Sequence, residues 1–127
     1  MKLRPALLSF LFIMAISALG FDACATKPPP VAKVDFAKQV RPIFEAYCYQ
    51  CHGNGRNRAG FRIDQKALVM RQIVAGDPAR SYLYRAMTKS LGASDHMPPM
   101  NEDQPEDSDL ATIKLWIEQG AVWPEGA

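Results

Sequence analysis

Cys48, Cys51 and His52 form a C-x-x-C-H motif, which constrains this chain more than any other feature of its sequence. Two thiols three positions apart, followed directly by an imidazole, are typical of covalent c-type haem attachment. Each sulfur can add across one haem vinyl group, and the adjacent histidine can then bind the iron. The motif therefore predicts one haem c per chain, attached through Cys48 and Cys51, with His52 as an iron ligand.

Two other interpretations of the same residues are weaker. A thioredoxin-like dithiol needs a βαβ setting, and the sequence shows no such alternation. A zinc site needs four ligands, yet no second C-x-x-C or H-x-x-x-H motif accompanies this one. A structural disulfide is not expected at this tight spacing.

The first residues of the chain predict export. Lys2 and Arg4 precede an apolar run over residues 6–19, as in a secretory signal with a basic start. The run is short for a membrane span, so an uncleaved signal anchor is the alternative. Export agrees with the haem motif, because covalent c-type haem is installed outside the cytoplasm. We expect residues 1–24 to be an export signal and the protein to lie in the periplasm or cell envelope.

Cys24 is the odd cysteine. Residues 21–24 read Phe-Asp-Ala-Cys and resemble a lipoprotein box, in which Cys24 would carry the lipid. The alternative is ordinary cleavage after Ala25. Lipidation would anchor the protein to a membrane, and residues 25–33, with three consecutive prolines, would form a semi-rigid tether.

One small domain is expected over residues 34–124, followed by a tail over residues 125–127. About ninety residues support one modest core. Without Lys2, Arg4 and Asp22, 13 basic and 12 acidic residues remain of the chain's 15 and 13, a net charge of +1. That balance, with no dense basic cluster, argues against nucleic-acid binding.

Helical periodicity dominates this domain. Asp35 is a good N-cap for a first helix that leads into Cys48, and Pro42 should kink this helix or begin a second one. Its apolar stripe comprises Phe36, Val40, Ile43, Phe44 and Tyr47.

Further helices are expected over residues 65–74, 77–88 and 105–119. In the second of these Asp77 would cap, Pro78 would take the first position, and Tyr82, Leu83 and Met87 would face the core. The last would bury Leu110, Ile113, Trp116 and Ile117, carry acidic residues in its first turns and end at Gly120.

Residues 53–60 read as a loop, and residues 61–64 as a short extended piece. Arg56, Arg58 and Arg62 are candidates to bind a haem propionate, because guanidinium binds carboxylates as a bidentate fork. Arg62 is the favoured candidate, and a solvated surface role is the alternative for each.

Residues 93–100 hold the candidates for the second axial position. His96, Met97 and Met100 lie within five residues on a segment stiffened by Pro98 and Pro99. A thioether on iron favours the ferrous state and raises the reduction potential. Met70 and Met87 lie within apolar helical patterns and are expected to be core residues.

Several motifs occur in an order that resembles a known family. They are Asp35-Phe36, Val40-Arg41-Pro42-Ile43-Phe44, Cys48-x-x-Cys51-His52-Gly53, Gly76-Asp77-Pro78, Ser81-Tyr82-Leu83-Tyr84, His96-Met97-Pro98-Pro99, Trp116-Ile117 and Gly120-Ala121. This layout resembles the planctomycete-type branch of single-haem cytochrome c domains. The resemblance implies an all-α, class I cytochrome c-like fold wrapped around one covalent haem. It also implies that Met97 is the distal ligand, ahead of Met100 and His96, and that Trp116 packs beside the haem.

The expected function is single-electron transfer between redox partner proteins, because iron held between His52 and a methionine has no place for a small-molecule substrate. The sequence shows no further set of catalytic residues, so an enzyme is not expected. A five-coordinate haem sensor or peroxidase-like enzyme is one alternative. An electron-port subunit of an exported dehydrogenase or oxidase is another.

Overall fold

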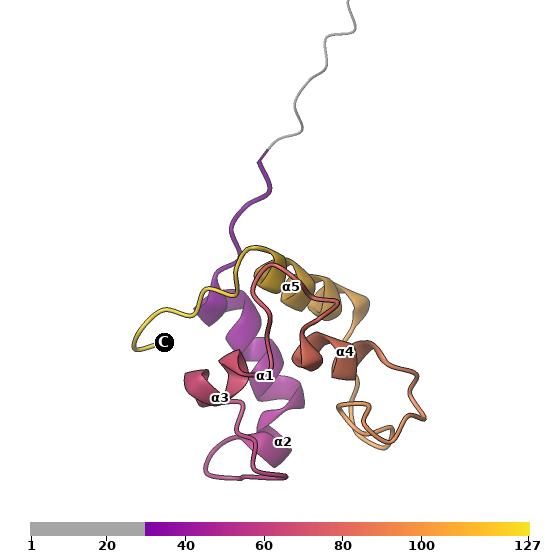
Figure 1. Cartoon of the computed structure of the whole chain (residues 1–127). Helices are drawn as coiled ribbons and strands as arrows, with labels where there is room; N and C mark the ends of the chain where they lie inside the picture. The colour runs from indigo at the N-terminus through magenta and orange to yellow at the C-terminus, as the bar shows by residue number, and fades with distance from the viewer. Residues whose placement is uncertain (1–29) are drawn as a thin grey trace, which may run out of the picture. The chain divides into compact units, whose positions relative to one another are not determined.

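The computed structural model describes residues 30–127, so the predicted export signal over residues 1–24 and Cys24 lie outside the described residues. Residues 31–127 form one compact unit. Its regular elements are η1 Phe36–Val40, α1 Arg41–Tyr47, α2 Tyr49–His52, α3 Lys66–Met70, α4 Tyr82–Thr88 and α5 Asp107–Glu118 (Figure 1). The described part of the chain contains no strand, only an isolated bridge between Arg58 and Phe61. The expected all-α class is confirmed.

The first helical segment begins and divides where the sequence predicts. The Asp35 carboxylate accepts a hydrogen bond from the Lys38 amide at 3.1 Å and caps the π-helical turn η1. Pro42 then occupies the first turn of α1, where its missing N–H costs nothing. The second of the two expected outcomes for Pro42 is therefore the observed one.

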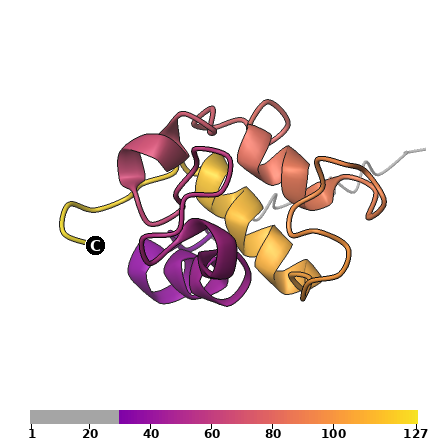
Figure 2. The same ribbon diagram turned by 90° about the horizontal axis from the view of Figure 1, so that it is seen from below.

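An aromatic core joins the two ends of the domain. Phe36 stacks on Trp123 with ring centroids 3.9 Å apart, and Trp116 of α5 meets Phe36 and Phe44 at centroid distances of 5.7 and 6.1 Å. Segment η1 packs on α5, which crosses the domain in the view from below (Figure 2). Trp116 and Phe44 are each 1 % exposed, so this region excludes water without help from any ligand.

The middle helices are shorter than predicted. The Ser81 hydroxyl accepts from the Val74 amide at 2.9 Å and lies 2.8 Å from the Asp77 carbonyl, to which it donates. α3 ends at Met70, and residues 77–80 form a turn in which Asp77 caps the Arg80 amide at 3.0 Å. α4 begins only at Tyr82. The predicted helices over residues 65–74 and 77–88 are corrected accordingly.

The last helix begins two residues later than expected and ends near the predicted stop. Glu106 and Asp109 form a reciprocal capping box, and Gly120 adopts a φ of 98° directly beyond the C-cap. Ile113, Trp116 and Ile117 are buried as predicted, whereas Leu110 is only partly buried. No helix in residues 30–127 is long and apolar enough to cross a membrane.

Candidate haem site

The two cysteines and the histidine lie on a single turn of helix. Cys48 follows α1 and begins α2, and its carbonyl accepts from the Cys51 amide at 3.2 Å and from the His52 amide at 2.8 Å. Positions three and four apart on a helix lie on the same side, so Cys51 and His52 lie on the same side as Cys48. Gly53 follows because a Cβ there would lie 2.6 Å from Cγ of Tyr49.

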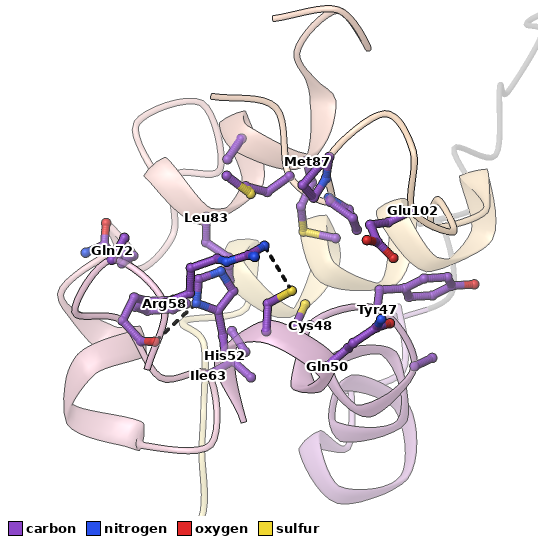
Figure 3. Close-up of a pocket in the computed structure, with 18 of the residues that line it drawn as sticks. Tyr47, Cys48, Gln50, His52, Arg58, Ile63, Gln72, Leu83, Met87 and Glu102 are labelled. Atoms are coloured by element: carbon purple, nitrogen blue, oxygen red, sulfur yellow. Dashed lines mark hydrogen bonds between the residues drawn. The ribbon is translucent and has the colours of Figure 1, made fainter. Parts of the chain in front are cut away.

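This turn forms one wall of a cavity of about 310 Å³. Figure 3 shows Cys48 and His52 on one side, with Leu83 and Met87 of α4 facing them. The lining is mainly apolar, as in most cofactor sites. The remaining lining residues that matter here are Tyr47, Cys51, Arg58, Phe61, Ile63, Tyr82, Ala86, Met97, Pro98, Pro99, Glu102 and Asp103.

The orientation of the His52 ring is set by a backbone carbonyl. Nδ1 lies 3.1 Å from the Phe61 carbonyl oxygen, to which it donates (Figure 3). A proton on Nδ1 leaves the Nε2 lone pair available for a metal, and such a hydrogen bond fixes the tautomer of most metal-binding histidines. The Ile63 amide also donates to the His52 carbonyl at 2.7 Å. Residues 61–63 therefore hold both the backbone and the ring of His52.

Burial makes Cys48 a poor nucleophile as a free thiol. Desolvation, with a smaller contribution from Cys51, raises the pKa of Cys48 to about 12. A thiol in such surroundings stays protonated at neutral pH. A thioether has no proton to lose, so covalent attachment suits this apolar position better than a thiolate.

The three candidate distal ligands have different surroundings. Met97 lines the cavity and is 37 % exposed. Met100 does not line it and is 66 % exposed. His96 is 6 % exposed and also lies off the cavity, with Nδ1 3.0 Å from the Lys89 carbonyl and Nε2 2.8 Å from Oε1 of Gln104. Of the three, only Met97 lines the cavity that Cys48 and Cys51 also line.

Met87 is a second thioether in the cavity wall. It is 6 % exposed and belongs to the core cluster, as its place in the apolar pattern of α4 predicts. Its position on the lining was not expected, because periodicity identifies a buried face but not the side of the core that borders a cavity. Tyr82 is predicted to face the core, but it lines the cavity and is 42 % exposed.

Two residues predicted to contact the cofactor, Arg62 and Trp116, do not line this cavity. Arg62 donates to both oxygens of Asp64, at 3.0 and 2.7 Å, and does not line the cavity. Its guanidinium already has the carboxylate that a propionate would have supplied. Trp116 lies in the aromatic core, donates from Nε1 to the Val122 carbonyl at 3.0 Å and is absent from the cavity wall.

Arg58 lines the cavity instead of Arg62. Its Nη1 donates to Sγ of Cys51 at 3.4 Å, as the dashed line in Figure 3 marks. Among the described residues that line this cavity, Arg58 is the only arginine or lysine. Arg58 is one of the three arginines that the sequence analysis names, of which it favours Arg62; of these three, only Arg58 lines the cavity.

Comparison with known proteins identifies the region around the cavity. Residues 48–101 match the family model described as Planctomycete cytochrome C. This segment is a planctomycete-type cytochrome c domain. No curated protein and no solved structure matches the chain. The resemblance predicted from the sequence motifs is confirmed over residues 48–101, and cytochrome c domains are typical of haem-binding electron carriers.

The residues of the cytochrome c domain fit haem c. The cavity brings together two thiols, an imidazole with its Nε2 lone pair available, and a thioether from a distant segment. Imidazole and thioether are the axial ligands of many cytochromes c. Cys48 and Cys51 would hold the macrocycle covalently, and His52 and Met97 are the residues placed to hold the iron.

Proposed function

We propose that this domain carries single electrons between redox partner proteins, with haem c held between His52 and Met97. The observation that supports this most strongly is the convergence of Cys48, Cys51, His52 and Met97 on one apolar cavity. Bound haem c supplies a one-electron couple at its iron. Every other property of the carrier comes from the residues that hold and surround that group.

Two features of the wall favour electron transfer over catalysis. His52 and Met97 would fill both axial positions, which leaves no position for a substrate or a gas. Leu83, Ala86 and Ile63 are buried apolar residues of the same wall, and an apolar shell controls dielectric and redox potential. A neutral thioether on one side favours the reduced state of the iron.

The proposal includes a place in the cell. The basic and apolar pattern of residues 1–24 supports export to the periplasm or cell envelope, and Cys24 supports a lipid anchor. The proline-rich residues 25–33 would then tether the domain to the membrane. Redox proteins in the same compartment, an exported dehydrogenase or oxidase among them, are the expected partners.

The test is the far-red absorption spectrum of the oxidised, haem-bound protein. We expect a weak charge-transfer band of the kind that methionine sulfur gives on ferric haem. Met97→Ala should abolish this band, whereas Met100→Ala should leave it unchanged, because Met100 is exposed and lies off the cavity.

A high-spin spectrum without the band in the unmodified protein would contradict the proposal. Binding of added ligands by that protein would then favour the five-coordinate alternative, a haem sensor or a peroxidase-like enzyme. Retention of the band in Met97→Ala with its loss in Met87→Ala would assign the distal position to the other thioether of the cavity wall.

A further inference from the structure

We propose that Gln104 is the positioning residue for the Met97 thioether, a role that rests on the proposed ligation of iron by Met97. Gln104 lies seven positions after Met97 and does not line the cavity. Any influence it has on the site must therefore pass through the intervening loop. Its hydrogen bonds show how this occurs.

The side-chain amide of Gln104 gathers the carbonyl groups of the loop. Nε2 lies 3.2 Å from the Pro98 carbonyl oxygen, 2.9 Å from that of Pro99 and 2.9 Å from that of Glu102, and its two N–H groups are shared among these three acceptors. On the other side of the amide, Oε1 lies 2.8 Å from Nε2 of His96. Rotating the amide by half a turn would set Oε1 against three carbonyl oxygens, so the network fixes its orientation.

The loop has few other means of holding its shape. Pro98 and Pro99 have no amide proton, and residues 96–102 contain no helix or strand. The Pro99 carbonyl accepts from the Glu102 amide at 2.9 Å as well as from Gln104, whereas Gln104 is the donor to the Pro98 carbonyl in the described residues. A single side-chain amide thus links three backbone carbonyl groups of this loop.

The other end of the network is anchored to α4. Nδ1 of the His96 ring lies 3.0 Å from the carbonyl oxygen of Lys89, the C-cap of α4, and the single N–H of a neutral ring serves either this oxygen or Oε1 of Gln104. The Met97 amide donates to the Ala86 carbonyl in α4, also at 3.0 Å. Met97 is therefore held on its N-terminal side by α4 and on its C-terminal side by Gln104, with its side chain at the cavity between them.

The consequence is a closed loop that presents sulfur to the cavity. Without Gln104, the proline carbonyls would turn to water and the loop would open more often. Added imidazole competes with methionine for iron only when the loop is open, so its apparent affinity reports the open fraction. Loss of two or more hydrogen bonds should raise that affinity about tenfold.

The experiment titrates imidazole into the oxidised, haem-bound protein and follows loss of the far-red band. Gln104→Leu removes the amide, and Gln104→Glu keeps its size but sets a carboxylate oxygen toward the three carbonyls. We expect imidazole to bind about tenfold more tightly in either variant. If Gln104→Leu does not accumulate with haem, Gln104→Glu provides the same comparison.

Gln119→Leu is the matched control. Gln119 also joins two chain segments, because Oε1 accepts from the Val34 amide at 2.7 Å and Nε2 donates to the Ala32 carbonyl at 3.0 Å. It lies away from the cavity. We expect Gln119→Leu to unfold at lower denaturant concentration with unchanged imidazole affinity. A generally destabilised fold would instead move both properties in all three variants.

Two results would contradict the inference, and they differ from failure of the proposed function. Equal imidazole affinity in the unmodified protein and in both Gln104 variants would show that the amide does not position Met97. An equal rise in Gln119→Leu would show that the effect is general. Absence of the far-red band from the unmodified protein would instead refute Met97 ligation, before any variant is compared.

Discussion

Arg58 and Arg62 lie four positions apart, and their neighbours give them different roles. Arg62 is paired with Asp64, which also accepts from the Asn54 amide at 3.1 Å. This cluster closes the loop that begins at Gly53 and returns beside His52. Arg58 has no carboxylate partner in the described part of the chain, and its guanidinium lies at the attachment cysteine. Chemically equal side chains therefore differ only in what the folded loop places beside them.

The Asp64 cluster predicts a dependence of stability on pH. The hydrogen bond from Arg62, followed by the charge of Arg62, lowers the pKa of Asp64 below its ordinary value. A carboxyl with a lowered folded-state pKa stabilises the protein above its unfolded pKa, about 3.9, and loses that contribution as the pH falls through the folded value. Asp64→Asn should therefore lower the free energy of unfolding by about 1 kcal/mol at pH 7.

The measurement is denaturant unfolding of the haem-bound protein at neutral and at strongly acid pH. The difference between Asp64→Asn and the unmodified protein should shrink toward zero in acid. Glu125→Gln is the control, because Glu125 pairs with Lys66 while its side chain is 92 % exposed. An exposed pair contributes little, so this variant should match the unmodified protein at both pH values. A difference for Asp64→Asn that stays constant with pH would refute the assignment.

At the scale of elements, the hydrogen bonds at and between the helix ends are the main feature. The fully buried Ser81 binds backbone groups of Val74 and Asp77 in the segment that joins α3 to α4. α5 has the most complete ends, with a capping box at Glu106 and a glycine beyond its C-cap. The turn after α5 returns the chain to the core, where the Ala121 amide donates to the Trp116 carbonyl at 2.8 Å.

This turn makes Gly120 a sensitive position. Its φ of 98° lies in the region that residues with a Cβ avoid, and a Cβ there would have no atom within 4 Å. Gly120→Ala should therefore cost about 1–2 kcal/mol of stability through backbone strain alone.

Gly92→Ala is the matched control for that prediction. A Cβ at Gly92 also has nothing within 4 Å, and the backbone φ there is not positive. Denaturant unfolding followed by far-UV circular dichroism should show a lower midpoint for Gly120→Ala and little change for Gly92→Ala. Equal midpoints in the two variants would mean that the turn relaxes without cost.

At the scale of the whole domain, two apolar regions lie side by side and differ in what fills them. Phe36, Phe44, Trp116 and Trp123 pack against one another and leave no need for a ligand. The cavity between α2, α4 and the Met97 loop is lined by apolar side chains that border open space. The first region supports the fold, and the second brings together the residues that would hold haem c.

Covalent attachment through Cys48 and Cys51 predicts a result on a denaturing gel. Replacement of both by serine should abolish the haem-stained band, because no sulfur remains to bond the vinyl groups. Cys24→Ser is the control: it removes the third cysteine, so its stained band should persist.

The same control variant tests the proposed anchor. If Cys24 carries the lipid, Cys24→Ser should move the haem-stained protein from the membrane fraction to the soluble fraction. Unchanged fractionation would favour an uncleaved signal anchor or a bound partner. A stained band that survives in Cys48→Ser/Cys51→Ser would refute covalent attachment at the motif itself.

The local chemistry of this protein can be predicted from sequence because it depends on near neighbours. The spacing of Cys48, Cys51 and His52 suffices to predict haem attachment, since one helical turn places all three together whatever surrounds it. Helix ends also depend on residues close in sequence, as the cap at Asp35, the start at Pro42 and the stop at Gly120 show. The motif order likewise leads to the family that residues 48–101 match.

Only the tertiary structure decides which residues share the cavity. Trp116 and Arg62 looked suitable as cofactor contacts, yet one packs in the aromatic core and the other binds Asp64. The wall includes Met87, Arg58 and Tyr82 because α4 and the loop over residues 53–60 border the same cavity as α2. The bonds of Gln104 to His96 and three carbonyls arise in the same way. The physical reason is that such contacts join segments whose approach depends on packing of the entire domain, whereas spacing along a helix depends on the backbone alone.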